Sequence, residues 1–100
     1  MLMLITGNSN GYFENVWDWV GDHDIDFNSQ GLDGQIDIFV GRGFLIIGDG
    51  GGLVFRGTAS EHSVLHQYNI VNAKNVYLSI IQTESPYFQG SHLYQAPTPF

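Results

Sequence analysis

Short apolar runs separated by glycine-rich turns form the main pattern of the chain. Turn signals occur at Asn10-Gly11, Asp33-Gly34, 41–43 and 48–52. The runs between them are rich in β-branched and aromatic residues and predict strands near 12–17, 35–40, 44–47, 53–56, 64–71 and 76–82. No segment keeps a helical apolar spacing for three turns, and single helical turns are expected only near 21–27 or 58–62. The pattern therefore predicts an all-β protein.

Two all-β architectures fit this pattern. A sandwich or barrel joins its strands by hairpins, whereas a parallel β-helix stacks successive coils about 4.8 Å apart. The sequence has no strict repeat, so periodicity alone does not choose between them. Residues 1–100 are expected to form a single domain, with 90–100 as an extended tail.

Charge and composition limit the partners. The chain has 100 residues and a formal net charge of -7, with ten acidic residues against three Lys and Arg. Such a chain is repelled by phosphate backbones and anionic lipid, so we expect no nucleic-acid or membrane partner. Neutral sugars remain possible partners. There are no cysteines, which excludes disulfides and thiolate metal sites.

Two glutamates are the strongest candidates for chemistry. Glu61 and Glu84 each follow a predicted strand and are 23 residues apart, about one β-helix coil built from strands of roughly 5–6 residues and short connections. Neighbouring coils would place both carboxyl groups at one groove, as inverting glycosidases require. Each glutamate also has a structural interpretation without a catalytic role. The segment 58–61 fits a helix capping box, and Glu84 fits an ordinary loop acid.

Other motifs are weaker. The segment 22–26 alternates Asp as calcium loops do, but glycine and glutamate are not where such a loop needs them, and we interpret it as a polar turn with one Asp capping a short helix. His62 and His66 do not meet the zincin order, so hydrogen bonding or packing is expected of them. The glycines at 48–52 predict a turn and not a phosphate loop.

Several stretches, taken together, resemble glycoside hydrolase family 55, a group of fungal-type β-1,3-glucanases. The similarity covers roughly 11–89, in order, and is carried by 12–20, 22–26, 40–46, 57–63, 67–76 and 81–89. It departs at 48–56, which lacks the family's more aromatic stretch. Family members are several times longer, so the resemblance implies a fragment of the C-terminal β-helix that lacks the N-terminal one.

The resemblance implies a right-handed parallel β-helix and a secreted, extracellular parent protein that hydrolyses β-1,3-glucan, as exo-β-1,3-glucanases do, with inversion and without metal or cofactor. Glu84 corresponds to the general acid, and Glu61 to an acid that positions the water. Gln82, Thr83, Tyr87 and His62 would lie near the terminal glucose.

The implied mechanism sets an electrostatic expectation, and the fragmentary length leaves alternatives. We expect partial burial and the charge of Glu61 to raise the pKa of Glu84. A non-catalytic β-solenoid or glucan-binding remnant and, more weakly, a lectin-like sandwich are the alternatives.

Overall fold

The structure is a computed structural model that describes residues 1–24, 34–36, 38–48 and 51–86. Every regular element in these ranges is a strand, which confirms the predicted all-β class. The strands are β1 (Met3–Ile5), β2 (Asn10–Glu14), β3 (Trp17–Trp19), β4 (His23–Asp24), β5 (Gly34–Gln35), β6 (Arg42–Ile47), β7 (Gly52–Glu61), β8 (His66–Val71) and β9 (Val76–Glu84).

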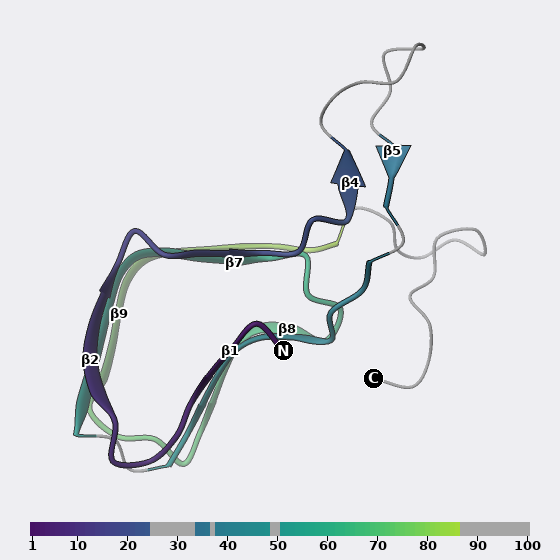
Figure 1. Cartoon of the computed structure of the whole chain (residues 1–100). Helices are drawn as coiled ribbons and strands as arrows, with labels where there is room; N and C mark the ends of the chain where they lie inside the picture. The colour runs from purple at the N-terminus through teal and green to yellow at the C-terminus, as the bar shows by residue number, and fades with distance from the viewer. Residues whose placement is uncertain (25–33, 37, 49–50, 87–100) are drawn as a thin grey trace.

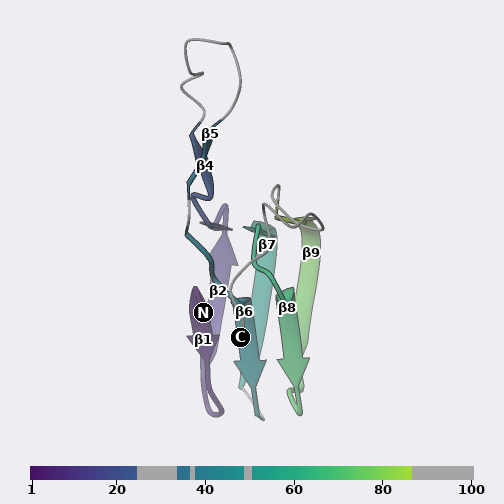
Figure 2. The ribbon, with the colours of Figure 1, turned by 90° about the vertical axis from the view of Figure 1, so that its right-hand side faces the viewer.

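The chain passes three times through two parallel sheets. One sheet has the order β1-β6-β8, and in the other β7 pairs with β2, β3 and β9. Figure 1 shows the three passes lying over one another, and Figure 2 shows the strands of each sheet side by side. The short antiparallel pair β4-β5 projects from the first pass. Because both larger sheets are parallel, the described strands do not form a hairpin-linked sandwich or a closed barrel.

The passes are stacked in register at their corners as well as along their strands. Glu14 pairs with Arg56, and Arg56 with Ser79. The next residues in these passes, Asn15, Gly57 and Ile80, all have positive φ angles of 55°, 59° and 54°. Asn and Gly accept this left-handed conformation readily, whereas a β-branched residue is strained in it. The chain thus turns at the same point in each pass.

Aromatic and aliphatic side chains fill the space between the two sheets. Phe44 and Phe55 are fully buried and meet edge to face at 5.6 Å. Phe13 stacks on Phe55 at 4.7 Å, and Tyr68 stacks on Phe44 at 5.0 Å. Each aromatic pair adds about 0.5–1.5 kcal/mol beyond its buried area. Residues from all three passes therefore share one core.

Several local predictions were wrong. The expected helical turn at 58–62, with its capping box, is the end of strand β7, because pairing with β3 and β9 satisfies this backbone. The strand expected at 35–40 shrinks to Gln35 among the described residues, and 38–40 are irregular. Of the helical turn expected at 21–27, residues 21–22 are irregular and 23–24 form a strand. Residues 25–27 and the tail 90–100 lie outside the described residues. Among the described residues, no helix is long and apolar enough to cross a membrane.

Gly43 is required by the close approach of β6 to its neighbours. A Cβ there would collide with the Ser60 side chain and the Gln67 carbonyl oxygen. We expect Gly43→Ala to lower the free energy of unfolding by about 1–3 kcal/mol, the range for overpacking. Urea denaturation measures this change in the free energy of unfolding. Gly51→Ala is the control, since its Cβ would lie 3.5 Å from Asn10, and an equal loss in both variants would contradict the steric account.

Ile80 has the left-handed backbone of Asn15 and Gly57, and as a β-branched residue it is strained there. Its side chain is 77% exposed, so little packing opposes a substitution. Left-handed backbone at such a residue costs on the order of 1–3 kcal/mol. We expect Ile80→Asn to raise the free energy of unfolding by about 1 kcal/mol. Ile81→Asn, at a position without positive φ, should give no gain; stabilisation by both variants would point to surface polarity instead.

Candidate active site

Two columns of side chains meet where β3, β7 and β9 end. Trp19, Glu61 and Glu84 are in register across the three strands. Two residues earlier, Trp17, Ala59 and Gln82 form the second column. Residues two apart in a strand point to the same face, so the two columns share it. The 23-residue spacing therefore does correspond to one pass, and it makes Glu61 and Glu84 direct neighbours.

Glu61 is a buried carboxylate held by two donors. Only 5% of the residue is exposed. The indole N–H of Trp17 donates to Oε2 at 2.8 Å, and the amide N–H of Gln82 donates to Oε1 at 2.7 Å. A buried carboxylate is costly unless hydrogen-bonded, and donors on both oxygens suit an ionised group. Glu61 is therefore fixed in position by the first and third passes.

Glu84 is placed differently. Its side chain is 43% exposed, and Oε1 lies 3.6 Å from Nε2 of His62. The backbone N–H of His62 donates to the Glu84 carbonyl at 2.9 Å, which ties the end of β7 to the end of β9. The site thus holds one buried, fully engaged carboxyl and one accessible carboxyl beside an imidazole.

His62 is buried and conformationally constrained. Its φ angle is +64° and 3% of the residue is exposed. Its Nδ1 lies 2.7 Å from Oδ1 of Asp22 and 3.2 Å from the indole nitrogen of Trp19. An imidazole nitrogen has one in-plane position and serves only one of these contacts. The contact with the Asp22 carboxylate is the shorter of the two, and the Trp19 indole N–H is the donor in the longer one.

Asp22 also accepts from a second histidine. Nδ1 of His23 lies 2.9 Å from the same Oδ1 atom. Asp22, His23 and His62 are all buried, and their nitrogen and oxygen atoms lie within 4.8 Å of one another. This closeness alone would suit a metal ion. Because both histidine nitrogens point at one oxygen at hydrogen-bonding distance, we assign the three as a hydrogen-bonded cluster and not as metal ligands.

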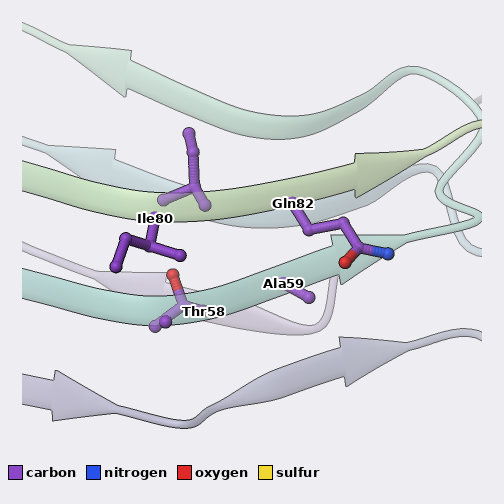
Figure 3. A pocket seen from close by; sticks show the side chains of 6 residues that line it. Thr58, Ala59, Ile80 and Gln82 are labelled. Atoms are coloured by element: carbon purple, nitrogen blue, oxygen red, sulfur yellow. The ribbon is translucent and has the colours of Figure 1, made fainter.

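A pocket of about 260 Å³ adjoins the site on β7 and β9. Gly57, Thr58, Ala59, Ile80, Ile81 and Gln82 line it. Figure 3 shows Gln82 leaving β9 with its amide directed over β7. Gln82 thus links the pocket to Glu61, which its amide also contacts.

The alternate face of the same strands carries polar residues. Asp18, Ser60 and Thr83 are in register there, and Ser60 is fully buried. Desolvation raises the pKa of Asp18 above its ordinary value. Burial also raises the pKa of the Tyr68 hydroxyl, and its hydrogen bond with Thr58 at 3.0 Å opposes this. On this face burial is complete at Ser60 on the central strand, whereas Thr83 on β9 is exposed.

The predicted site residues fall into two groups. Glu61, Glu84, Gln82 and His62 converge. Thr83 follows the register of buried Ser60 and so points away from the shared face. Tyr87 lies outside the described residues. The expectation that no metal or cofactor is needed stays a prediction.

Three contributors were not assigned a site role from the sequence. Asp22 was interpreted as a turn residue or helix cap, although it bonds a histidine 40 positions away. Trp17 and Trp19 belong to an aromatic-rich stretch at 11–19, for which the sequence indicates sugar stacking or core packing and no contact with Glu61 or His62. Their spacing of two residues, which puts both on one face of a strand, was the available signal.

Comparison with known proteins shows that the chain is related to fungal proteins named for glucan hydrolysis. It is 50% identical over 91 residues to a probable glucan endo-1,3-beta-glucosidase of Arthroderma benhamiae, covering 91% of the chain and 10% of that protein. It is 36% identical over 97 residues to a glucan 1,3-beta-glucosidase of Cochliobolus carbonum, covering 96% and 11%.

A third relative has a different name. The chain is 48% identical over 100 residues to the non-secreted LysM effector LysM15 of Penicillium expansum, covering 100% of the chain and 7% of that protein. The chain thus spans about a tenth of the length of the curated relatives it matches. No protein-family model matches the chain. No solved structure matches it.

Asp18 gives the fold a specific pH dependence. Its pKa is raised in the folded state, so the folded chain binds this proton more tightly than the unfolded chain. Stability from this group is therefore present at low pH and lost as pH rises through the raised folded pKa. We expect Asp18→Asn to raise the thermal unfolding midpoint at pH 7 and to change it little near pH 3. Glu14→Gln, at an exposed acid, is the control. Equal shifts at both pH values would contradict this account.

Proposed function

We propose that the chain is the acid-bearing part of a β-1,3-glucan hydrolase of glycoside hydrolase family 55. In this proposal the three passes are coils of a right-handed parallel β-helix, and longer relatives continue the stack. The parallel in-register sheets support the architecture. The names of two relatives support the substrate class, a β-1,3-glucan.

The pairing of Glu61 with Glu84 across β7 and β9 is the single observation that carries the proposal. Glycoside hydrolysis needs one carboxylic acid that protonates the leaving oxygen and a second carboxylate that acts on water or sugar. Glu84 is the accessible member and serves as general acid. Glu61, held by Trp17 and Gln82, orients the attacking water and accepts its proton as the water oxygen bonds to the sugar carbon and the glycosidic C–O bond breaks.

Inversion is part of the proposal because the family resemblance implies it, and the two carboxyl groups have different partners. Glu61 is held by donors from both neighbouring strands, whereas Glu84 is turned to His62. Inverting enzymes leave room for a water between carboxyl groups roughly 6.5–9.5 Å apart, more than retaining enzymes use. The exposed Trp17 ring, 62% exposed and 5.5 Å from the Trp19 ring, offers an apolar face on which a pyranose can stack.

The proposal also covers sugar binding by Gln82 and the location of the protein. Gln82 reaches both Glu61 and the pocket and contacts the sugar bound there. The parent protein acts outside the cell. One relative is described as non-secreted, and cell fractionation of the organism that makes this chain tests the location.

The second candidate is glucan binding without turnover. The chain spans 7–11% of its relatives, and an active site shared with other parts of a longer protein would leave this chain with binding alone. The neighbouring Trp17 and Trp19 rings and the pocket support retained binding.

Hydrolysis of reduced β-1,3-gluco-oligosaccharides tests the proposal. It is measured on the chain and on the Arthroderma benhamiae relative in which this chain replaces the matching segment. We expect Glu84→Gln to lower kcat by about 10²–10⁴-fold, the contribution of a general acid. Proton NMR should show an α-anomer as the first product, as inversion requires.

Glu14→Gln serves as the matched control, because Glu14 is a described acid on β2 whose contact with Arg56 lies at the surface. It should change kcat by no more than a factor of about two, because surface substitutions away from the site have small effects. Full activity of Glu84→Gln would overturn the proposal. Oligosaccharide binding without turnover in both proteins would favour the second candidate.

A further inference from the structure

The exposed aromatic side chains of the described residues gather on one sheet. They are Tyr12 on β2, Trp17 on β3 and Tyr77 on β9, which are 58%, 62% and 60% exposed. All three strands pair with β7. Within its described strands, the β1-β6-β8 sheet exposes aliphatic side chains and no aromatic ring. Single exposed apolar residues are ordinary on a protein surface, whereas rings grouped on one sheet call for a contact that uses them.

Tyr12 and Tyr77 stand in one row across this sheet. In the register of the strands, Tyr12 pairs with Val54, and Val54 pairs with Tyr77. The next residue of each strand packs in the core, and alternation along a strand therefore directs the row outward. The two tyrosines are two interstrand spacings apart, about 9.6 Å, with a smaller side chain between them. These three residues are called the tyrosine row.

A corner of the fold separates the tyrosine row from the candidate active site. Asn15, Gly57 and Ile80 form this corner with their positive φ angles, and Trp17 lies beyond it. Figure 1 shows the chain bending between the part labelled β2 and β9 and the part labelled β7, so the two halves of the sheet face different directions. The tyrosine row is therefore a second surface and not an extension of the site around Glu61 and Glu84.

The surroundings of the row are polar and have no net charge. Asn10 and Ser79, which each lie two residues from a tyrosine, supply an amide and a hydroxyl group on the same face. Glu14 and Arg56 lie 3.8 Å apart and cancel in formal charge, although the whole chain has a net charge of -7. The row lacks the positive charge that an anionic ligand requires and suits a neutral, hydroxylated one.

The distance between the two rings indicates the size of such a ligand. A β-linked glucose has equatorial hydroxyl groups and apolar C–H faces, and an aromatic ring stacks on such a face while its rim binds the hydroxyl groups. Rings about 9.6 Å apart are too far from each other to enclose a single sugar between them. They can contact two different sugars of one chain, and two linked contacts bind more tightly than either alone.

We propose that the tyrosine row is a β-glucan binding surface, separate from the acid pair, on which Tyr12 and Tyr77 stack on two sugars of one glucan chain. The β-1,3 linkage of that chain rests on the proposed function, whereas the stacking surface is a property of this chain itself. The surface would hold a long or insoluble glucan beside the site without taking part in hydrolysis.

Binding of β-1,3-gluco-oligosaccharides of increasing length to the 100-residue chain tests the surface. In NMR titrations, long oligosaccharides should shift the ring signals of Tyr12 and Tyr77. They should still do so in Trp17→Ala, because Trp17 lies beyond the corner. Tyr12→Ala and Tyr77→Ala should each weaken the binding measured at these rings about 5–10-fold, the equivalent of one aromatic contact.

Two kinds of control separate stacking from other effects of substitution. Tyr12→Phe and Tyr77→Phe keep the ring and should change the affinity by no more than about two-fold, since the apolar face does most of the stacking. Ile70→Ala removes an exposed side chain from β8 in the other sheet and should leave the affinity unchanged.

Kinetics of the grafted relative distinguish this surface from the acid pair. The variant with both Tyr12→Ala and Tyr77→Ala should keep kcat and KM on short reduced oligosaccharides within about two-fold, and should hydrolyse insoluble β-1,3-glucan about 10-fold more slowly. Glu84→Gln should show the reverse, with turnover lost and binding at the tyrosine row kept.

The possible results separate the two proposals. Tyrosine signals that do not move with glucan, or an unchanged affinity in both alanine variants, overturn this inference even if Glu84→Gln abolishes turnover. Alanine variants that alter only the sedimentation of the chain overturn it as well, because the row is then a contact between copies. Binding at the row in a protein that never hydrolyses glucan, or binding of β-1,4-linked chains alone, supports the surface and refutes the proposed function.

Discussion

Parallel, in-register pairing of β7 with β9 is the interaction on which the rest of the structure depends. It runs from Leu53–Val76 to Glu61–Glu84 and is interrupted only at the corner formed by Gly57 and Ile80. Its first half aligns apolar residues around Phe55, and its second half aligns the polar residues of the site. Because side chains alternate along a strand, a shift of one residue would exchange the inner and outer faces. Core and site therefore share one register.

The site concentrates features that cost stability. Glu61 and Asp22 are buried acids, and His62 has left-handed backbone. Each cost is offset locally: Glu61 by donors from two strands, Asp22 by two histidines, and His62 by hydrogen bonds and ring packing. Hydrogen bonds among buried polar groups rigidify a region. This rigidity separates a fixed carboxylate from an accessible one, which is the asymmetry that acid and base roles need.

Several features of the site could be read from the sequence. The 23-residue interval between Glu61 and Glu84 was sufficient to expect neighbouring strands, because one pass of this fold has nearly that length. The roles of Asp22 and of the two Trp residues were not accessible in this way. Asp22 meets His62 only because the first pass lies against the second, and the intervening β4 and β5 lengthen that pass. Local propensity also misassigned 58–62, where strand pairing overrides a helix-capping motif.

The sequence by itself determined that the chain is all-β and that two acids lie one pass apart. These features depend on local conformational preference and on spacing, which the order of residues contains directly. Only the tertiary structure decided that the sheets are parallel, that Gln82 contacts Glu61 while Thr83 lies on the opposite face of β9, and that Asp22 supports His62. Those outcomes depend on which strands meet and in what register, and the energy that fixes the register comes from contacts between residues distant in the chain.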